Sequence, residues 1–121
     1  MTMFFQRPLM AAMSATLVLT MVGCAQQPRS LYQWGSYQQQ VYARFNGKTS
    51  PQEQVQALEA DLARIQAAGQ VPAPGMRAHL GMLYAEMGQK DSARKMLEAE
   101  KAQFPESTRY MDFLLSRINN P

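Results

Sequence analysis

The sequence predicts an all-α protein built from four to five short helices. After residue 50, apolar residues recur at steps of three and four, the spacing that places them on one face of an α-helix. Glycines, prolines and helix-capping residues divide this pattern into separate helices. No segment after Asn46 alternates apolar and polar residues with period two, so no β-sheet is expected.

The first 23 residues are predicted to be a secretory signal that is removed by cleavage. Arg7 is the only charged residue among them, and residues 8–22 form an uncharged, mostly apolar run. This order of a charged region followed by an apolar region is typical of a signal peptide. The run is shorter than the roughly 20 residues that a membrane-spanning helix needs, which makes a permanent transmembrane anchor the less favoured alternative.

Residues 21–24, MVGC, resemble the lipobox of bacterial lipoproteins, although Met21 stands where leucine is usual. The resemblance implies that Cys24 carries the lipid and becomes the first residue of the mature chain. Cys24 is the only cysteine, so no disulfide within the chain competes with this role. Because Ala25 is not the aspartate that retains such lipoproteins in the inner membrane, the resemblance also implies an outer-membrane location, with the periplasm as the expected side.

Composition narrows the possible partners of the mature chain. The chain of 121 residues has twelve Lys and Arg, of which only Arg7 lies in the predicted signal, against nine Asp and Glu. No basic cluster is longer than Arg94-Lys95, so binding of nucleic acid is not expected. A mature chain of this length forms one small domain with a modest core.

An aromatic segment, residues 31–48, follows a short polar tether at residues 24–30. Its polar residues favour a helix over about 33–45. Three interpretations remain open: packing as core, a surface for a protein partner, or a membrane-interface belt of tryptophan and tyrosine. The candidate partner-binding residues are Tyr32, Trp34, Tyr37 and Tyr42.

Residues 50–119 are predicted to form the helical domain. Residues 46–49 are a turn, after which Ser50 is expected to cap a helix whose first residue is Pro51, with Glu53 completing a capping box. The predicted helices cover about 51–68, 76–87, 92–104 and 107–118. The apolar stripe of the last helix comprises Tyr110, Met111, Leu114, Leu115 and Ile118.

Residues 74–107 resemble a tetratricopeptide repeat, so the domain is expected to be a short tetratricopeptide-like helical array. The residues that carry the resemblance are Leu80, Gly81, Tyr84, Gly88, Ala93, Leu97 and Pro105. Gly81 and Ala93 would allow two helices to approach closely, and Gly88 would supply a positive φ in the turn. Arg77 and Glu100 depart from the pattern, which suggests a divergent or terminal copy. The resemblance implies a protein-binding scaffold.

Little in the sequence points to catalysis, and the protein is expected not to be an enzyme. His79 is the only histidine and is interpreted as a surface or groove residue. The carboxylate pairs Glu59/Asp61 and Glu98/Glu100 are two residues apart, a spacing that points helical side chains in different directions and suits a solvated face. No cofactor or metal site is expected, because histidine and cysteine are too few.

The order of these features is similar to that of a family of small Gram-negative outer-membrane lipoproteins of undetermined function. The resemblance includes the lipobox, the LYxWGxYxxxVY segment at 31–42 and the repeat-like hairpin. Members are often encoded beside a lipoprotein similar to the curli-secretion pore subunit. The resemblance implies a scaffold or accessory subunit of an envelope secretion or surface-assembly complex, anchored through Cys24. The alternative is an outer-membrane regulator of enzymes that synthesise or cleave peptidoglycan.

Overall fold

The computed structural model describes residues 29–119. The predicted signal, Cys24 and most of the predicted tether lie outside these residues. The described chain is all-α, as the sequence predicts. Its elements are α2 (Tyr37–Phe45), α3 (Pro51–Ala67), α4 (Met76–Glu86), α5 (Lys90–Gln103), the 3₁₀ helix η2 (Pro105–Ser107) and α6 (Thr108–Asn119).

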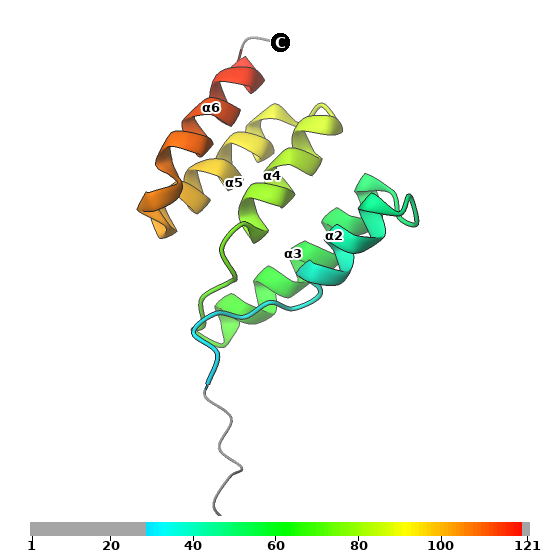
Figure 1. The fold of residues 1–121 in the computed structure, drawn as a ribbon, viewed down its shortest axis with the longest axis vertical. Coiled ribbons are helices and arrows are strands. Elements are labelled where there is room, and N and C mark those ends of the chain that lie inside the picture. Colours follow the sequence, from blue (N-terminus) through cyan, green and yellow to red (C-terminus); the bar gives the residue numbers. More distant parts are fainter. Residues whose placement is uncertain (1–28, 120–121) are drawn as a thin grey trace, which may run out of the picture.

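Consecutive helices contact each other along the whole described chain, from α2 to α6. Figure 1 shows α2 beside α3 at one end of the array, α4 and α5 in the middle, and α6 at the other end. Successive helices run in opposite directions, as in a stack of helical hairpins. Between residues 29 and 119, no helix is both long and apolar enough to span a membrane.

The start of α3 is fixed by a reciprocal capping box, as the sequence predicts. The Ser50 hydroxyl accepts a hydrogen bond from the Glu53 amide at 3.2 Å, and the Glu53 carboxylate accepts the Ser50 amide at 2.8 Å. Hydrogen bonds from the backbone and hydroxyl of Ser50, and from Thr49, lower the pKa of Glu53. The two bonds of the capping box satisfy the amides of Ser50 and Glu53, which would otherwise have no partner in the first turn of the helix.

Replacing Ser50 by alanine is expected to lower the free energy of unfolding by about 1 kcal/mol, because the Glu53 amide loses its acceptor. Urea unfolding followed by circular dichroism measures this change. Ser116→Ala is the matched control, since the exposed Ser116 hydroxyl only bonds the carbonyl of Phe113 within α6. We expect that variant to stay within about 0.5 kcal/mol of the wild type. Equal stability of both variants would contradict the capping role.

Helices α4 and α5 approach most closely at Gly81. A Cβ atom at this position would lie 3.1 Å from the carbonyl oxygen of Ala93 and 3.1 Å from the side chain of Leu97. Gly88 begins the connection to α5 with φ of 76°, a conformation that favours glycine. The hairpin therefore uses these residues in the way the repeat-like pattern requires.

The buried apolar residues form two adjacent clusters. The larger joins α3 to α4 and includes Leu58, Leu62, Met76 and Leu80. The smaller joins α4 and α5 to α6 through Ala78, Leu97, Met111 and Leu115. Leu58 and Leu62 of α3 and Met111 and Leu115 of α6 lie at the spacing of three and four residues that predicts these helices, so burial of their apolar stripes holds the array together.

Helix α2 begins at Tyr37, four residues later than predicted. Gln33 instead pairs in extended conformation with the loop before α4: its amide donates to the Val71 carbonyl at 2.8 Å, and its carbonyl accepts the Ala73 amide at 2.9 Å. Gly35 then has φ of 48°, which no α-helix contains. The backbone pairing to a distant loop thus overrides the local helical pattern.

Candidate functional site

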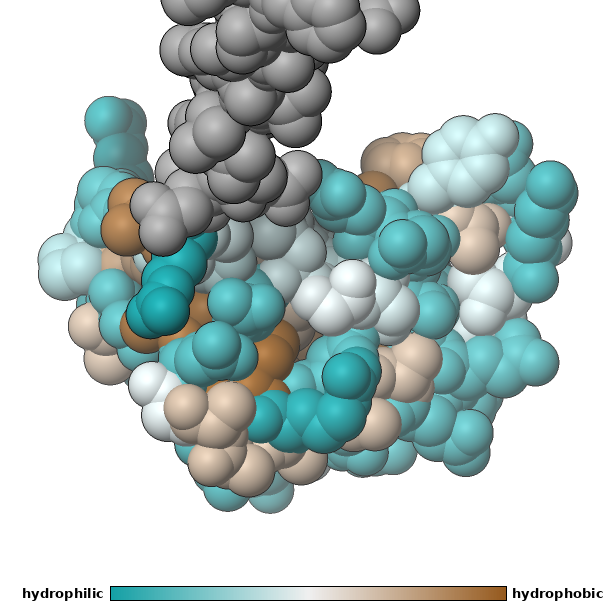
Figure 2. Space-filling view, turned by 90° about the horizontal axis from the view of Figure 1, so that it is seen from below, coloured by the Kyte–Doolittle hydropathy of each residue, from teal (hydrophilic) through white to brown (hydrophobic). Residues whose placement is uncertain are grey.

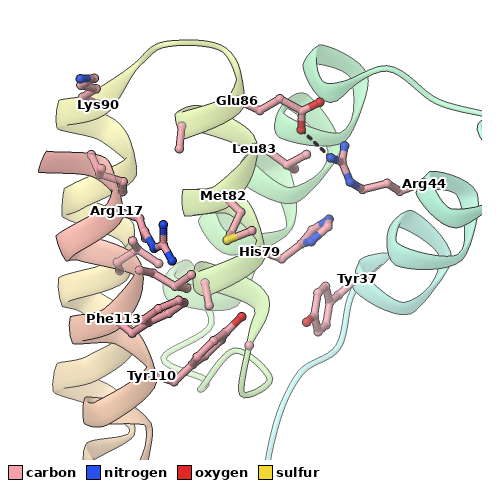
Figure 3. A pocket seen from close by; sticks show the side chains of 16 residues that line it. Tyr37, Arg44, His79, Met82, Leu83, Glu86, Lys90, Tyr110, Phe113 and Arg117 are labelled. Atoms are coloured by element: carbon pink, nitrogen blue, oxygen red, sulfur yellow. Dashed lines mark hydrogen bonds and ion pairs between the residues drawn. The ribbon is translucent and has the colours of Figure 1, made fainter. Parts of the chain in front are cut away.

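An apolar groove of about 810 Å³ lies on the side of the array formed by α2, α4 and α6. Figure 3 shows Tyr110, Phe113 and Arg117 on α6 and Tyr37 and Arg44 on α2, with α4 between the two helices. Helices α2, α4 and α6 are every second helix in the chain, and α3 and α5 connect them. The groove is therefore a direct product of the hairpin arrangement.

Large apolar side chains line the groove and remain about half exposed. They are Met82 on α4, and Tyr110 and Phe113 on α6, whose rings stack with centroids 6.3 Å apart. Beneath them lie the buried side chains of Leu83 and Leu97. Exposed apolar groups gathered in a hollow are unfavourable in water, and such surfaces commonly mark binding sites.

Basic groups stand at the edges of the groove. The Arg117 guanidinium lies over the Phe113 ring, 5.3 Å from its centroid. Lys90, the first residue of α5, also lines the groove. No carboxylate in residues 29–119 lies within ion-pair distance of either cation. Arg44 differs, since its guanidinium forms an ion pair with Glu86 at 2.5 Å and links α2 to α4.

Two neutral polar side chains lie where α2 meets α4. His79 is half-buried, its Nε2 atom lies 3.0 Å from Oε1 of Gln54, and its ring centroid lies 5.8 Å from that of Tyr37. Burial lowers the pKa of His79, and Arg44 lowers it further against an opposing effect of Glu86. Burial, and then the charge of Glu100, raise the pKa of the Tyr37 phenol. Neutral imidazole and neutral phenol are therefore favoured here at neutral pH.

Glu100 and Asp61 are buried, which corrects the prediction that both carboxylate pairs lie on a solvated face. Glu100 Oε1 accepts the amide of Gly75 at 2.6 Å, at the start of α4. A carboxylate is favourable there because the first amides of a helix carry partial positive charge. The departure from the repeat pattern at Glu100 thus provides a cap for the neighbouring helix.

Asp61 connects α3 to the N-terminal segment. Its Oδ2 atom accepts both the amide and the hydroxyl of Ser36, each at 2.6 Å, and Oδ1 pairs with Arg64. Burial raises the pKa of Asp61, but the Ser36 hydrogen bonds and the Arg64 charge outweigh it and the pKa is lowered. Asp61 therefore holds the start of α2 in place as a carboxylate.

The four candidate partner-binding residues lie in different environments. Tyr32 is half-buried and meets Phe104 edge to face at 5.7 Å, so it packs on the core. Tyr37 is half-buried and lines the groove, and the partly exposed Trp34 stacks on it at 6.2 Å. Tyr42 is exposed outside the groove. The structure thus brings only Tyr37 to the groove itself. Cys24, the predicted lipidation site, lies outside the described residues.

Sequence reasoning missed the groove residues of α6. The sequence places Tyr110 on the apolar stripe of that helix, but Tyr110 is exposed, and the stripe does not include Phe113. A signal was available, because six large apolar residues in a twelve-residue helix exceed what one buried stripe needs. Met111 and Leu115 face the core, which leaves Tyr110 and Phe113 on a second face that lines the groove.

No group of three or more His, Cys, Asp or Glu side chains in residues 29–119 is arranged to hold a metal ion. Comparison with known proteins finds a match over residues 31–114 to the family described as a domain of unknown function, DUF4810. No curated protein and no solved structure matches the chain. The matched region begins at the aromatic segment and ends within α6, so it includes α2 to α5 and the first part of α6, whereas Arg117 and Ile118 of the groove lie beyond it. The chain belongs to the DUF4810 family.

Proposed function

We propose that this protein is a periplasm-facing outer-membrane lipoprotein that binds another envelope protein in the groove between α2, α4 and α6. In this role it is an accessory subunit of an envelope secretion or surface-assembly complex. The observation that carries the proposal is the exposure of Met82, Tyr110 and Phe113 together in one hollow. The lipobox-like residues 21–24 support the membrane anchor, and the repeat-like hairpin supports a scaffold role.

The side chains of the groove define the chemistry of the partner segment. Apolar side chains of the partner would cover Met82, Tyr110 and Phe113 and remove them from water. A carboxylate of the partner would meet Lys90 or Arg117, which have no acidic partner among the described residues. The groove thus fits a segment with two or three apolar side chains and at least one acidic residue.

Site-specific photo-crosslinking in intact envelopes tests this assignment. A photoreactive residue at Met82 is expected to form an adduct with an envelope protein, whereas one at Gln56, exposed on α3 and outside the groove, is not. The decisive step is to combine the Met82 probe with Phe113→Asp, which should abolish the adduct. An adduct that survives Phe113→Asp, or one that contains only lipid, would contradict the proposal.

The affinity of the captured partner supplies the quantitative prediction. Phe113→Asp is expected to raise the Kd of the purified partner at least about 30-fold, because it places a charge in the apolar part of the groove. Phe45→Asp is the matched control, since Phe45 is an exposed phenylalanine outside the groove. Titration in detergent, without a bilayer, should leave the Kd of that variant within about twofold of the wild type. Equal effects of both substitutions would exclude the groove as the binding site.

A further inference from the structure

A second set of exposed apolar side chains lies outside the groove, on the N-terminal segment and α2. It comprises Leu31, Trp34, Tyr42 and Phe45, which we call the N-terminal aromatic face. Leu31 and Phe45 are 83% and 86% exposed, so they are almost fully in water. None of the four lines the groove. Together with Met82, Tyr110 and Phe113 of the groove, they account for the exposed large hydrophobic residues of the described chain.

Helical geometry separates this face from the groove. Tyr37 and Arg44 are seven residues apart, so they share the side of α2 that lines the groove. Tyr42 and Phe45, three residues apart, lie together on a different side of the helix and are exposed. Helix α2 buries no residue completely. Its groove side and its outer side are therefore separate surfaces.

The segment that carries the N-terminal aromatic face is itself basic, although Asp61 of α3 and Glu86 of α4 contact it at Ser36 and Arg44. Between residues 25 and 52 the chain contains Arg29, Arg44 and Lys48 but no Asp or Glu. Arg29 and Lys48 are exposed, and neither is ion-paired in the described chain. A surface that combines tryptophan, tyrosine and aliphatic groups with unpaired cations is complementary to the interface of an anionic bilayer. Apolar and hydrophilic side chains are intermixed on the side of the molecule that Figure 2 shows.

The distance to the proposed anchor selects a bilayer as the occupant. Leu31 follows Cys24 by seven residues, which span at most about 25 Å when fully extended. An acylated Cys24 would keep Leu31 within that distance of the headgroups, and Trp34 follows Leu31 by three residues. We propose that the N-terminal aromatic face rests on the surface of the membrane that holds the anchor, and so orients the array relative to the bilayer. This inference rests on the lipid anchor of the proposed function but not on the groove.

Trp34 provides the test, because it is the only tryptophan in the chain. The acylated protein, produced from the full chain with acylation verified by mass spectrometry, is reconstituted into vesicles of phosphatidylethanolamine and phosphatidylglycerol. Lipids with brominated acyl chains are expected to quench the Trp34 fluorescence, and aqueous iodide is expected to quench it several-fold less than in the detergent-solubilised protein. The double variant Leu31→Ser, Phe45→Ser removes the most exposed apolar groups and should restore iodide quenching. Phe113→Asp is the control and should change neither result.

Two outcomes would overturn the inference. Trp34 that stays open to iodide and unquenched by brominated lipid in the acylated wild type would show that the face does not touch the bilayer. Protection that requires added envelope proteins would assign the face to a protein partner instead. The crosslinking from Met82 is unaffected by either outcome, so this test and the groove test can fail independently. Circular dichroism checks that the double variant keeps its helices, as expected for residues so exposed.

Discussion

Replacing Gly81 by leucine is expected to destabilise the protein by about 3 kcal/mol or more. Even the first carbon of a side chain at this position would lie 3.1 Å from the Ala93 carbonyl oxygen and from Leu97. The backbone of α5 cannot rotate away as a flexible side chain can, so the remaining carbons of leucine must separate the two helices. The loss is a large fraction of the 5–15 kcal/mol that typically stabilises a domain. Urea unfolding at 25 °C measures it.

Gly81→Ala separates the effect of packing from that of backbone flexibility. Alanine favours a helix over glycine by about 1 kcal/mol, which offsets the cost of the 3.1 Å contacts. We therefore expect that variant to unfold within about 1 kcal/mol of the wild type. If the leucine variant were as stable as the alanine variant, α4 and α5 would not meet at Gly81, and the described hairpin would be wrong.

The sequence predicts features that depend on neighbouring residues. The Ser50 capping box, the apolar stripe of α3 and the close approach at Gly81 each depend on spacing within one helix or hairpin, and the structure contains all three. Residues three or four positions apart necessarily meet on a helix, so such patterns are visible without coordinates. The helical class of the protein could be predicted for the same reason.

Features that depend on residues far apart in the chain could not be predicted. The late start of α2 follows from the pairing of Gln33 with residues 71–73, and the burial of Asp61 follows from its hydrogen bonds to Ser36. In the sequence Asp61 is one polar residue on an amphipathic helix, as Glu100 is on α5. Only the arrangement of the hairpins shows that each carboxylate satisfies an amide of another segment, Ser36 in one case and Gly75 in the other.

The groove illustrates the same limit. Met82 lies on α4, whereas Tyr110 and Phe113 lie on α6, about thirty residues later, and only the packing of the helices brings them to one hollow. The aromatic segment, by contrast, could be recognised by composition, but its two sides could not be distinguished. Tyr37 turns to the groove while Tyr42 turns outward because Asp61 and Gln33 fix the rotation of α2 on the array. Both roles proposed for α2, in the groove and at the membrane, therefore depend on that attachment.

Asp61→Asn is expected to loosen this attachment and to destabilise the protein by about 2 kcal/mol at neutral pH. The buried carboxylate accepts two hydrogen bonds from Ser36. An asparagine side chain keeps one acceptor oxygen but replaces the other with an NH2 group, which would face hydrogen-bond donors. Urea unfolding gives the energy, and Trp34 fluorescence reports release of the segment. Asp91→Asn is the matched control, because the Asp91 side chain is fully exposed, and we expect a change within about 0.5 kcal/mol.

The pH dependence distinguishes loss of the charge from loss of packing. Because the pKa of Asp61 is lower in the folded protein than its ordinary value of 3.8, the folded state favours the carboxylate. Its stabilising effect is therefore complete above the ordinary pKa and is lost as the pH falls through the lower, folded value. The difference in stability between wild type and Asp61→Asn should stay constant from pH 7 to about pH 5 and shrink below pH 4. A difference that persists unchanged into strong acid would mean that asparagine disturbs packing alone, and that the charge of Asp61 does not hold α2 in place.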